Sequence, residues 1–511
     1  MNLLIVRYFL TENRFLLVSL NVNAVLEEPT ILERKKKFVQ MARGNGLQGA
    51  YSSTLERIKA QSGSKPSLAM NTLMWLSHSE RPLTTNELCD ALGVGIGSAD
   101  RTSEGIPAIE TLLGCSLGLV VVEASTYTVR LVHRTLQEYL LDNTDLFPSP
   151  HAAIAEVCLT YLNFRCIRAL PPIPYRPQLG TSLLQYASCY WGIHARKEIT
   201  ESVNELAVRL LDGFDEHVSS RILLSHRGDN RDGSLGQSNG KGFTGLHGAA
   251  YLGMVGAAVG LLGMGKCDLG ATDVAGNTAI SWAVRQGHGD MVEVLLKWED
   301  VSPNTADRDG VTPLHRAVID GRADIVKMLL KREDLTPGTA GEDVQTPLLR
   351  AVIDKRTGIV GMLLGREDII PDAADEDGRT PLSWAVIKGH NAIVKMLLER
   401  EEVMPDTPHK NGRTPLSCAV ERGDIRVVEM LLERCGVSHD TLSTDPASQT
   451  ALTQTSRKQR GRVIKRIWRY TGGLLNFALN SPVRALFISS MCVLLLSIYL
   501  PIIVYHIISS F

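Results

Sequence analysis

Hydrophobic and polar positions repeat with a fixed period of 34 residues through the second half of the chain. Each period opens on a threonine that is followed two residues later by Leu or Ile, and a Leu-Leu pair stands near its end. The threonines are Thr244, Thr278, Thr312, Thr346, Thr380 and Thr414. Because self-similarity at such a period is typical of stacked repeats, this half of the chain is predicted to form a solenoid.

One period predicts two short helices and a loop. Thr312 can cap the first helix, and Pro313 fits the first helical position, where its missing N–H loses no hydrogen bond. Gly321 allows a tight turn, and Ile325 and Leu329 then share the apolar face of a second helix. The stretch that follows is rich in Gly, Pro and Asp, which favours an extended, hairpin-like turn.

The units resemble ankyrin repeats. The resemblance is carried by Thr-Pro-Leu-His at residues 312–315 and by the Thr-Pro-Leu that opens three later units. It implies six stacked repeats over residues 241–440, with a concave groove that binds other proteins.

Some units depart from this pattern. Gly245 and Ala279 stand where proline is expected in the first two units. In the fourth unit, Val344 and Lys355 replace glycines of the other units, so we expect that unit to be strained or loose. A degenerate seventh unit near Thr450 lacks a Leu-Leu pair, and we expect the array to end or fray there.

One position of each unit varies, and the resemblance to ankyrin repeats implies that it faces the groove. Its residues are Gly248, Trp282, Arg316, Arg350, Trp384 and Cys418. Trp and Arg often dominate binding energy at protein interfaces. We therefore predict partner binding by Trp282, Arg316, Arg350 and Trp384; the alternative is that the tryptophans only cover the inner helices.

Acidic residues gather in the loops of the middle units. They are Asp307, Asp309, Glu342, Asp343, Asp375, Glu376 and Asp377. These carboxylates could steer a basic segment of a partner toward the repeats, although solvated loops are often acidic without any partner.

The first half predicts a winged helix over residues 67–145. Two helices lie around the Arg-Pro-Leu-Thr turn at 81–84, where Thr84 or Thr85 can cap the second helix. A third helix, two alternating strands and a closing helix follow. The third helix carries no Lys or Arg, which argues against DNA binding.

This half resembles the winged helix that follows the NACHT nucleotide-binding domain in fungal signal-transducing ATPases with ankyrin tails, a segment also related to GPI inositol-deacylases. Trp75, Leu76 and the string VRLVHRTLQEYL at 129–140 carry the resemblance. Residues 183–196 resemble the helical linker of that family within residues 146–240, and residues 14–26 resemble the last helix of NACHT within residues 1–66.

No nucleotide site is predicted. The segment 260–267 matches a Walker loop, but Cys267 stands where Ser or Thr must bind magnesium, and the segment closes a helix instead of opening one. His133 matches a nucleotide-contacting histidine of the resembled family, and a structural role at a strand end is the favoured interpretation. The chain has no G-x-S-x-G nucleophile motif, so we predict no enzyme activity and no small-molecule substrate.

Composition changes this picture little. Net charge −1 and 44% hydrophobic residues describe an ordinary globular chain. The nine cysteines include no C-x-x-C motif, which favours a reducing, cytosolic compartment over a disulfide or zinc framework. We predict no cofactor and no metal.

The last 27 residues, 485–511, contain no Asp, Glu, Lys or Arg, and about 20 apolar residues suffice to span a bilayer. A buried helix of a soluble domain is the alternative. Residues 441–484 form a basic, amphipathic linker that is expected to contact lipid headgroups on the cytosolic side, although a nuclear-targeting or nucleic-acid role stays open. Its basic residues are Arg457, Lys458, Arg460, Arg462, Lys465, Arg466, Arg469 and Arg484.

Taken together, the sequence predicts a mainly α protein: a winged helix and helical linker, an ankyrin-repeat solenoid and a C-terminal transmembrane helix. The predicted function is a non-catalytic, membrane-tethered adaptor that binds a cytosolic protein partner, with a single-pass tail anchor and no nucleic-acid partner. The alternative is a truncated or partner-dependent NACHT-type regulatory ATPase involved in signalling.

Overall fold

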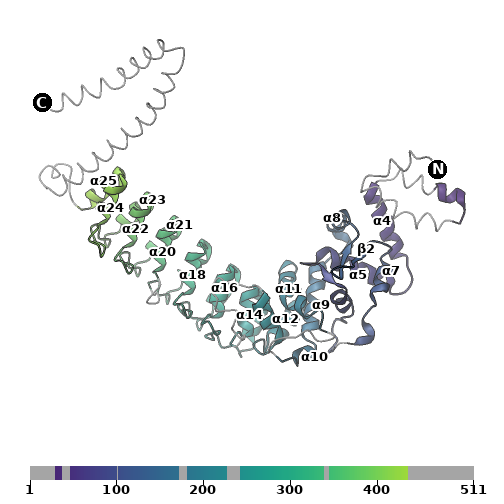
Figure 1. The fold of residues 1–511 in the computed structure, drawn as a ribbon. Coiled ribbons are helices and arrows are strands. Elements are labelled where there is room, and N and C mark those ends of the chain that lie inside the picture. Colours follow the sequence, from purple (N-terminus) through teal and green to yellow (C-terminus); the bar gives the residue numbers. More distant parts are fainter. Residues whose placement is uncertain are drawn as a thin grey trace, which may run out of the picture. The chain divides into compact units, whose positions relative to one another are not determined.

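The computed structural model describes residues 29–36, 46–100, 102–171, 181–226, 242–338 and 345–435. The chain forms two compact units that divide between residues 344 and 345. Helices make up most of the described chain, and Figure 1 shows them in chain order from the N-terminal helices to α25 (Ile425–Arg434).

The first part of the first unit is the predicted winged helix. Its helices are α5 (Lys65–His78), α6 (Thr85–Leu92), α7 (Ile109–Cys115) and α8 (Arg134–Asp142), with short 3₁₀ turns at Ser103–Gly105 and Thr144–Leu146. Helix α4 (Gly46–Lys59) lies before the predicted start at residue 67 and packs on α5 and α8. Its core includes Leu73, Trp75, Leu88, Leu112 and Leu136, all fully or almost fully buried.

The wing is an antiparallel sheet. The predicted strands are β2 (Val120–Glu123) and β3 (Thr128–Leu131), which pair with Val122 opposite Val129. A two-residue strand that the sequence did not reveal, β1 (Leu83–Thr84), pairs with the other edge of β3. In the described chain the strand order is therefore β1-β3-β2.

The start of α6 confirms one of the two predicted caps. The Thr84 side chain accepts a hydrogen bond from the backbone N–H of Glu87, and the Glu87 carboxylate accepts one from the N–H of Thr84. This reciprocal pair satisfies two backbone donors at the helix start. Arg81 also forms an ion pair with Glu87, which fixes the turn before the helix.

The helical segment that follows begins with α9 (Pro150–Leu162) and the single turn α10 (Arg165–Arg168). It continues with α11 (Leu184–Lys197), α12 (Glu201–Leu211) and α13 (Val218–His226). Helix α9 packs on α5, α11 and α12, so the winged helix and this segment share one packed interface.

Three helix pairs complete the described part of the first unit. They are α14 (Gly245–Leu252) with α15 (Val255–Gly263), α16 (Ala279–Gln286) with α17 (Gly289–Leu296), and α18 (Pro313–Ile319) with α19 (Ala323–Leu329). First helices pack on first helices and second helices on second helices. This arrangement confirms the predicted order of helix, turn, helix and loop.

The described part of the second unit holds three further pairs of the same kind. They are α20 (Pro347–Ile353) with α21 (Thr357–Leu364), α22 (Pro381–Lys388) with α23 (Asn391–Leu398), and α24 (Pro415–Arg422) with α25. Threonine caps the first helix in each pair; for example, Thr380 accepts a hydrogen bond from the N–H of Ser383. The capping role read from the repeating threonine is confirmed.

The expected strain in the fourth repeat is confirmed at one residue. Lys355 adopts a left-handed conformation with φ of 57°, where the equivalent Gly321 and Gly389 have φ of 70° and 74°. A side chain in this region costs roughly 1–2 kcal/mol relative to its relaxed backbone. Val344 lies outside the described residues.

The unusual first repeat has a packing explanation. Helix α12 lies against α15 and α14, and glycines on the repeat allow the close approach. A Cβ at Gly245 would lie 2.0 Å from the carbonyl oxygen of Leu211, and one at Gly260 would lie 2.7 Å from Val208 Cγ2. The helical segment therefore caps the first end of the repeat stack, as such solenoids require.

None of the described helices has the length and apolar character needed to cross a bilayer. The predicted span at 485–511, the basic linker at 441–484 and the segment near Thr450 lie outside the described residues. The NACHT-like segment at 14–26 lies outside them as well.

Candidate functional site

The turns between repeats are built around an aspartate. In one turn, Asp273 Oδ1 accepts hydrogen bonds from the backbone N–H groups of Ala275 and Asn277, at 2.9 and 2.8 Å. Asp307 and Asp375 stand 34 and 102 residues later and accept the equivalent pair of bonds. These carboxylates are therefore structural parts of the loops.

Both tryptophans of the predicted binding set are bonded to these turns. Trp282 Nε1 donates to Asp273 Oδ2 at 2.9 Å, and Trp384 Nε1 donates to Asp375 Oδ2 at 2.8 Å. In each case the aspartate precedes the tryptophan by nine residues. The indole thus ties the loop of a repeat to the first helix of the same repeat.

Trp282 is a packing residue in the first unit. It is 1% exposed and makes edge contacts with the rings of Phe243 and Tyr251, at centroid distances of 5.7 and 5.2 Å. This burial favours the alternative that Trp282 covers the inner helices. Its predicted contact with a partner stays a prediction.

Trp384 is partly exposed and lines a hollow of about 310 Å³ in the second unit. The hollow lies between the last two repeats, and its walls come from α22, α24 and the loops that precede these two helices. The lining residues are Arg379, Trp384, Ile387, His409, Asn411, Arg413, Cys418, Glu421 and Arg422. We call this hollow the Trp384 pocket.

Basic groups dominate the Trp384 pocket. The Arg379 guanidinium lies 5.1 Å from the centre of the Trp384 ring and pairs with Asp377 at 3.0 Å. Arg413 pairs with Glu421. Arg422 Nη1 donates to the carbonyl oxygen of Ile387 at 2.7 Å. Three guanidinium groups and one carboxylate thus line the pocket, and two of these guanidinium groups are paired with carboxylates.

His409 adds a buried polar atom to the same wall. Its side chain is 6% exposed, and its Nε2 has no hydrogen-bond partner among the described residues. It occupies the turn position that Asp273, Asp307 and Asp375 hold in other repeats. Burial lowers the pKa of His409 from its usual value, and the charges of Arg379 and Arg413 lower it further.

The two arginines of the predicted set lie one in each unit and are partly exposed. Arg316 follows the acidic turn of its own repeat, and its charge acts on Asp307. Arg350 Nε donates to Asp354 Oδ2 at 2.9 Å. The structure does not test whether either residue contacts a partner.

The acidic loop residues have two different roles. Asp307 and Asp375 bind their own turns, whereas Asp309 and Glu376 are exposed. Asp377 is paired with Arg379. Glu342 and Asp343 lie outside the described residues. A basic partner segment steered by these loops stays a prediction.

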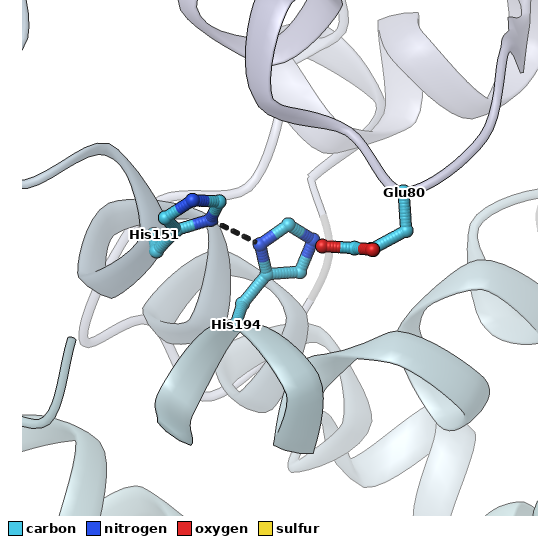
Figure 2. Close-up of side chains that lie close together, drawn as sticks. All are labelled: Glu80, His151 and His194. Atoms are coloured by element: carbon cyan, nitrogen blue, oxygen red, sulfur yellow. Dashed lines mark hydrogen bonds between the residues drawn. The ribbon is translucent and has the colours of Figure 1, made fainter. Parts of the chain in front are cut away.

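A second cluster lies in the first unit, where the winged helix meets the helical segment. Figure 2 shows the imidazole of His194, on α11, between His151 at the start of α9 and Glu80 in the loop after α5. The two histidines face each other through their Nδ1 atoms at 2.8 Å. One ligand atom from each of the three residues lies within 4.8 Å of the others.

Neighbouring groups hold the cluster in place. Tyr186 Oη lies 2.9 Å from His194 Nε2 and also accepts a hydrogen bond from the backbone N–H of Glu80. Lys197 Nζ pairs with Glu80 Oε1 at 2.6 Å. Burial lowers the pKa of His194 to about 3, so its ring is neutral at physiological pH.

His133 and the segment 260–267, which resemble parts of nucleotide sites in sequence, both occupy structural positions in the fold. His133 caps α8, because its Nδ1 accepts a hydrogen bond from the backbone N–H of Thr135. This geometry agrees with the favoured structural interpretation. The segment 260–267 includes the end of α15, as expected from the sequence, and no described strand precedes it directly.

Sequence reasoning missed a set of arginines that join neighbouring repeats. Arg332 donates to the carbonyl oxygens of Leu296 and Trp298, and Arg434 donates to those of Arg400 and Glu401. The signal was present, because Arg recurs at 332, 366, 400 and 434 with the repeat period. The Glu80, His151 and His194 cluster gave no comparable signal, since its members lie far apart in the sequence.

Comparison with known families agrees with the two folded parts. A model described as the winged helix domain of GPI inositol-deacylase matches residues 55–152. A model of ankyrin repeats matches residues 246–339 and 348–445. The chain therefore contains a winged helix domain followed by ankyrin repeats, which confirms that part of the predicted resemblance. No curated protein matches the chain.

Several solved structures are similar to part of the chain. The ankyrin repeat domain of Bcl-3 is 28% identical, with 37% of this chain and 85% of that chain covered and a TM-score of 0.34. The human ASB11 ankyrin repeat domain is 21% identical, with 41% and 96% covered and a TM-score of 0.32. A complex of the Bdellovibrio bacteriovorus endopeptidase Bd0816 with the immunity protein Bd3460 is 25% identical, with 37% and 96% covered and a TM-score of 0.32.

Proposed function

We propose that the protein is a non-catalytic adaptor that holds a protein partner on its ankyrin repeats, with the Trp384 pocket as the principal contact. Ankyrin repeats generally bind protein partners. The observation that carries the proposal is a partly exposed Trp beside three arginines, two residue types that dominate interface energetics. The partner is a cytosolic protein.

Capture of a partner by the full chain tests this function. Trp384→Ala should weaken capture of a cross-linked, identified partner by more than about thirtyfold, because truncating a central interface Trp commonly costs at least about 2 kcal/mol. Arg350→Ala should also weaken it. Met404→Ala is the matched control, since Met404 is exposed in the same unit and does not line the pocket. Equal capture by Trp384→Ala and Met404→Ala would contradict the proposal.

The adaptor is tethered to a membrane through residues 485–511, with the repeats in the cytosol. Support comes from the sequence alone: 27 residues without an acidic or basic side chain, preceded by eight basic residues and no acidic residue after Asp445. Removing residues 485–511 should move the protein from the alkali-resistant membrane fraction to the soluble fraction. Alkali-resistant retention of the shortened chain would reject the anchor.

The protein is related to NACHT signalling ATPases of fungi but acts without nucleotide hydrolysis. Support comes from the winged helix followed by ankyrin repeats, and from Cys267 in place of the magnesium-binding Ser or Thr in the segment 260–267. Purified protein should not bind ATP, and Lys266→Ala should change nothing. Saturable ATP binding that Lys266→Ala abolishes would favour the regulatory ATPase instead.

A further inference from the structure

We propose that Glu80, His151 and His194 form a binding site for a zinc ion that joins the winged helix to the helical segment beside it. Two imidazole nitrogens and a carboxylate oxygen are ligands that Zn²⁺ prefers. The three residues come from the loop after α5, the start of α9 and the body of α11. An ion held by all three would therefore fix two folded parts to each other.

The distances allow the site to close around an ion. Ligand atoms of a tetrahedral zinc lie about 3.3 Å apart, since each bond is about 2.0–2.1 Å long. The facing Nδ1 atoms of His151 and His194 are 2.8 Å apart, so the rings need to separate only slightly. One ligand atom from each residue lies within 4.8 Å of the others. Glu80 lies on the other side of the His194 ring from His151 (Figure 2), so its rotatable side chain has to swing toward Nδ1 of His194 to close the site.

Tyr186 supplies the outer support that zinc-bound histidines usually have. Its hydroxyl lies on Nε2 of His194, which leaves Nδ1 as the nitrogen that faces His151. When zinc takes Nδ1, the ring proton of His194 can reside on Nε2 and be donated to the Tyr186 oxygen.

The surroundings of the site give an ion access to Glu80, and they also place a lysine that competes with the ion for the Glu80 carboxylate. Glu80 lines a hollow of about 450 Å³ on the winged helix, together with Ser79, Arg81 and His133, so an ion can reach the carboxylate from solvent. Lys197 occupies Glu80 Oε1 in this structure, and its positive charge opposes a cation. Lys197 therefore weakens zinc binding, and its removal should strengthen it.

Zinc binding to the full chain provides the test, with zinc chloride as the probe and equilibrium dialysis followed by elemental analysis as the measurement. The wild-type chain should retain one zinc ion. Glu80→Gln and His151→Asn should each weaken retention by more than about a hundredfold, since even loss of an outer partner costs about 10- to 100-fold. Tyr186→Phe removes an outer partner and should weaken zinc retention by about 10- to 100-fold. Lys197→Met should bind zinc more tightly than wild type.

His226→Asn is the matched control, because His226 is exposed in the same unit and lies outside the cluster. Cobalt substitution should give a tetrahedral d–d spectrum without the charge-transfer band of a thiolate ligand, which separates this site from the cysteines. Failure of wild type to retain zinc, or unchanged retention by both Glu80→Gln and His151→Asn, would overturn the proposal. Lys197→Met keeps all three proposed ligands, so its effect on zinc retention tests the site even if a ligand variant misfolds.

Discussion

At the scale of single residues, a hydrogen bond from tryptophan to aspartate gives a structural reason why Trp recurs at one position of the repeat. Partner binding alone would not explain this recurrence. Trp282 and Trp384 occupy equivalent positions, and both bond to an aspartate nine residues earlier. The repeats with Arg at this position do not show that bond in the described residues. The recurring tryptophans that suggested a binding surface thus also stabilise the fold. Trp282 is buried and has the packing role, whereas Trp384 is partly exposed and is the one proposed to contact a partner.

The Trp282→Phe variant should be less stable than wild type by about 2 kcal/mol. A buried indole N–H bonded to a carboxylate contributes about 1.5–3 kcal/mol, and Phe leaves the carboxylate of Asp273 without this donor. Trp384→Phe should lose less, because the side chain is partly exposed and water can replace the donor. Urea unfolding of each variant checks this order, and a larger loss for Trp384→Phe would contradict it.

His217 should make the first unit sensitive to acid. Its Nδ1 accepts the backbone N–H of Ser219, and its Nε2 is bonded to the carbonyl oxygen of Leu162. Burial, together with a smaller effect of the Arg168 charge, lowers the pKa of His217 to about 4 from its ordinary value of 6.5. Between these pH values the unfolded chain takes up a proton that the folded chain does not, so stability should fall as pH drops from 6.5 toward 4.

The loss should reach about 3 kcal/mol, at about 1.4 kcal/mol for each unit of pKa shift. In His217→Gln the free energy of unfolding should vary less with pH over this window, even though the variant starts from a lower value. Unfolding curves of both proteins at several pH values measure the difference. Parallel pH profiles would show that His217 is not the group responsible.

At the scale of elements, the sequence was enough to place most helices and the main strands. The capping threonines and the helical spacing of Ile325 and Leu329 come from local physics, which a single repeat already contains. β1 could not be predicted, because two residues carry no periodicity and the strand exists only through pairing with β3. The tight packing of α12 on the first repeat depends on contacts between distant segments, so the glycines alone did not reveal it.

That packing predicts opposite effects for two glycines of the first repeat. Gly245→Ala should destabilise the junction by about 1–3 kcal/mol, because its Cβ would overlap the backbone of Leu211. Gly263→Ala should be neutral or stabilising by up to about 1 kcal/mol, because a Cβ there meets nothing within 4 Å. Amide hydrogen exchange of α12 and α14 measures this, and protection should be lower in Gly245→Ala than in Gly263→Ala. Equal protection in the two variants would contradict the claim that α12 caps the first repeat.

At the scale of the whole molecule, the sequence predicted a winged helix followed by ankyrin repeats. It did not predict which residues come together in either candidate site. The Trp384 pocket needs the loop of the last repeat beside a helix of the repeat before it, and only the stacked structure shows that His409 and Arg413 share it with Trp384. The zinc-site residues are brought together by the packing of α5, α9 and α11. The repeat pattern was enough to predict the fold of the repeats from the sequence. The two candidate sites are formed by contacts between segments that the repeat pattern does not relate, so the sequence did not reveal them.

The central claim is that a partner protein occupies the Trp384 pocket. A photo-cross-linking amino acid placed at position 413, on the wall of the pocket, tests it most directly in cells that express the full chain. Position 404 in the same unit is the control. We expect a discrete cross-linked protein from position 413 that is absent from position 404 and is lost with Trp384→Ala. Cross-links of equal yield from both positions, or a cross-link from 413 that survives Trp384→Ala in a folded chain, would contradict it.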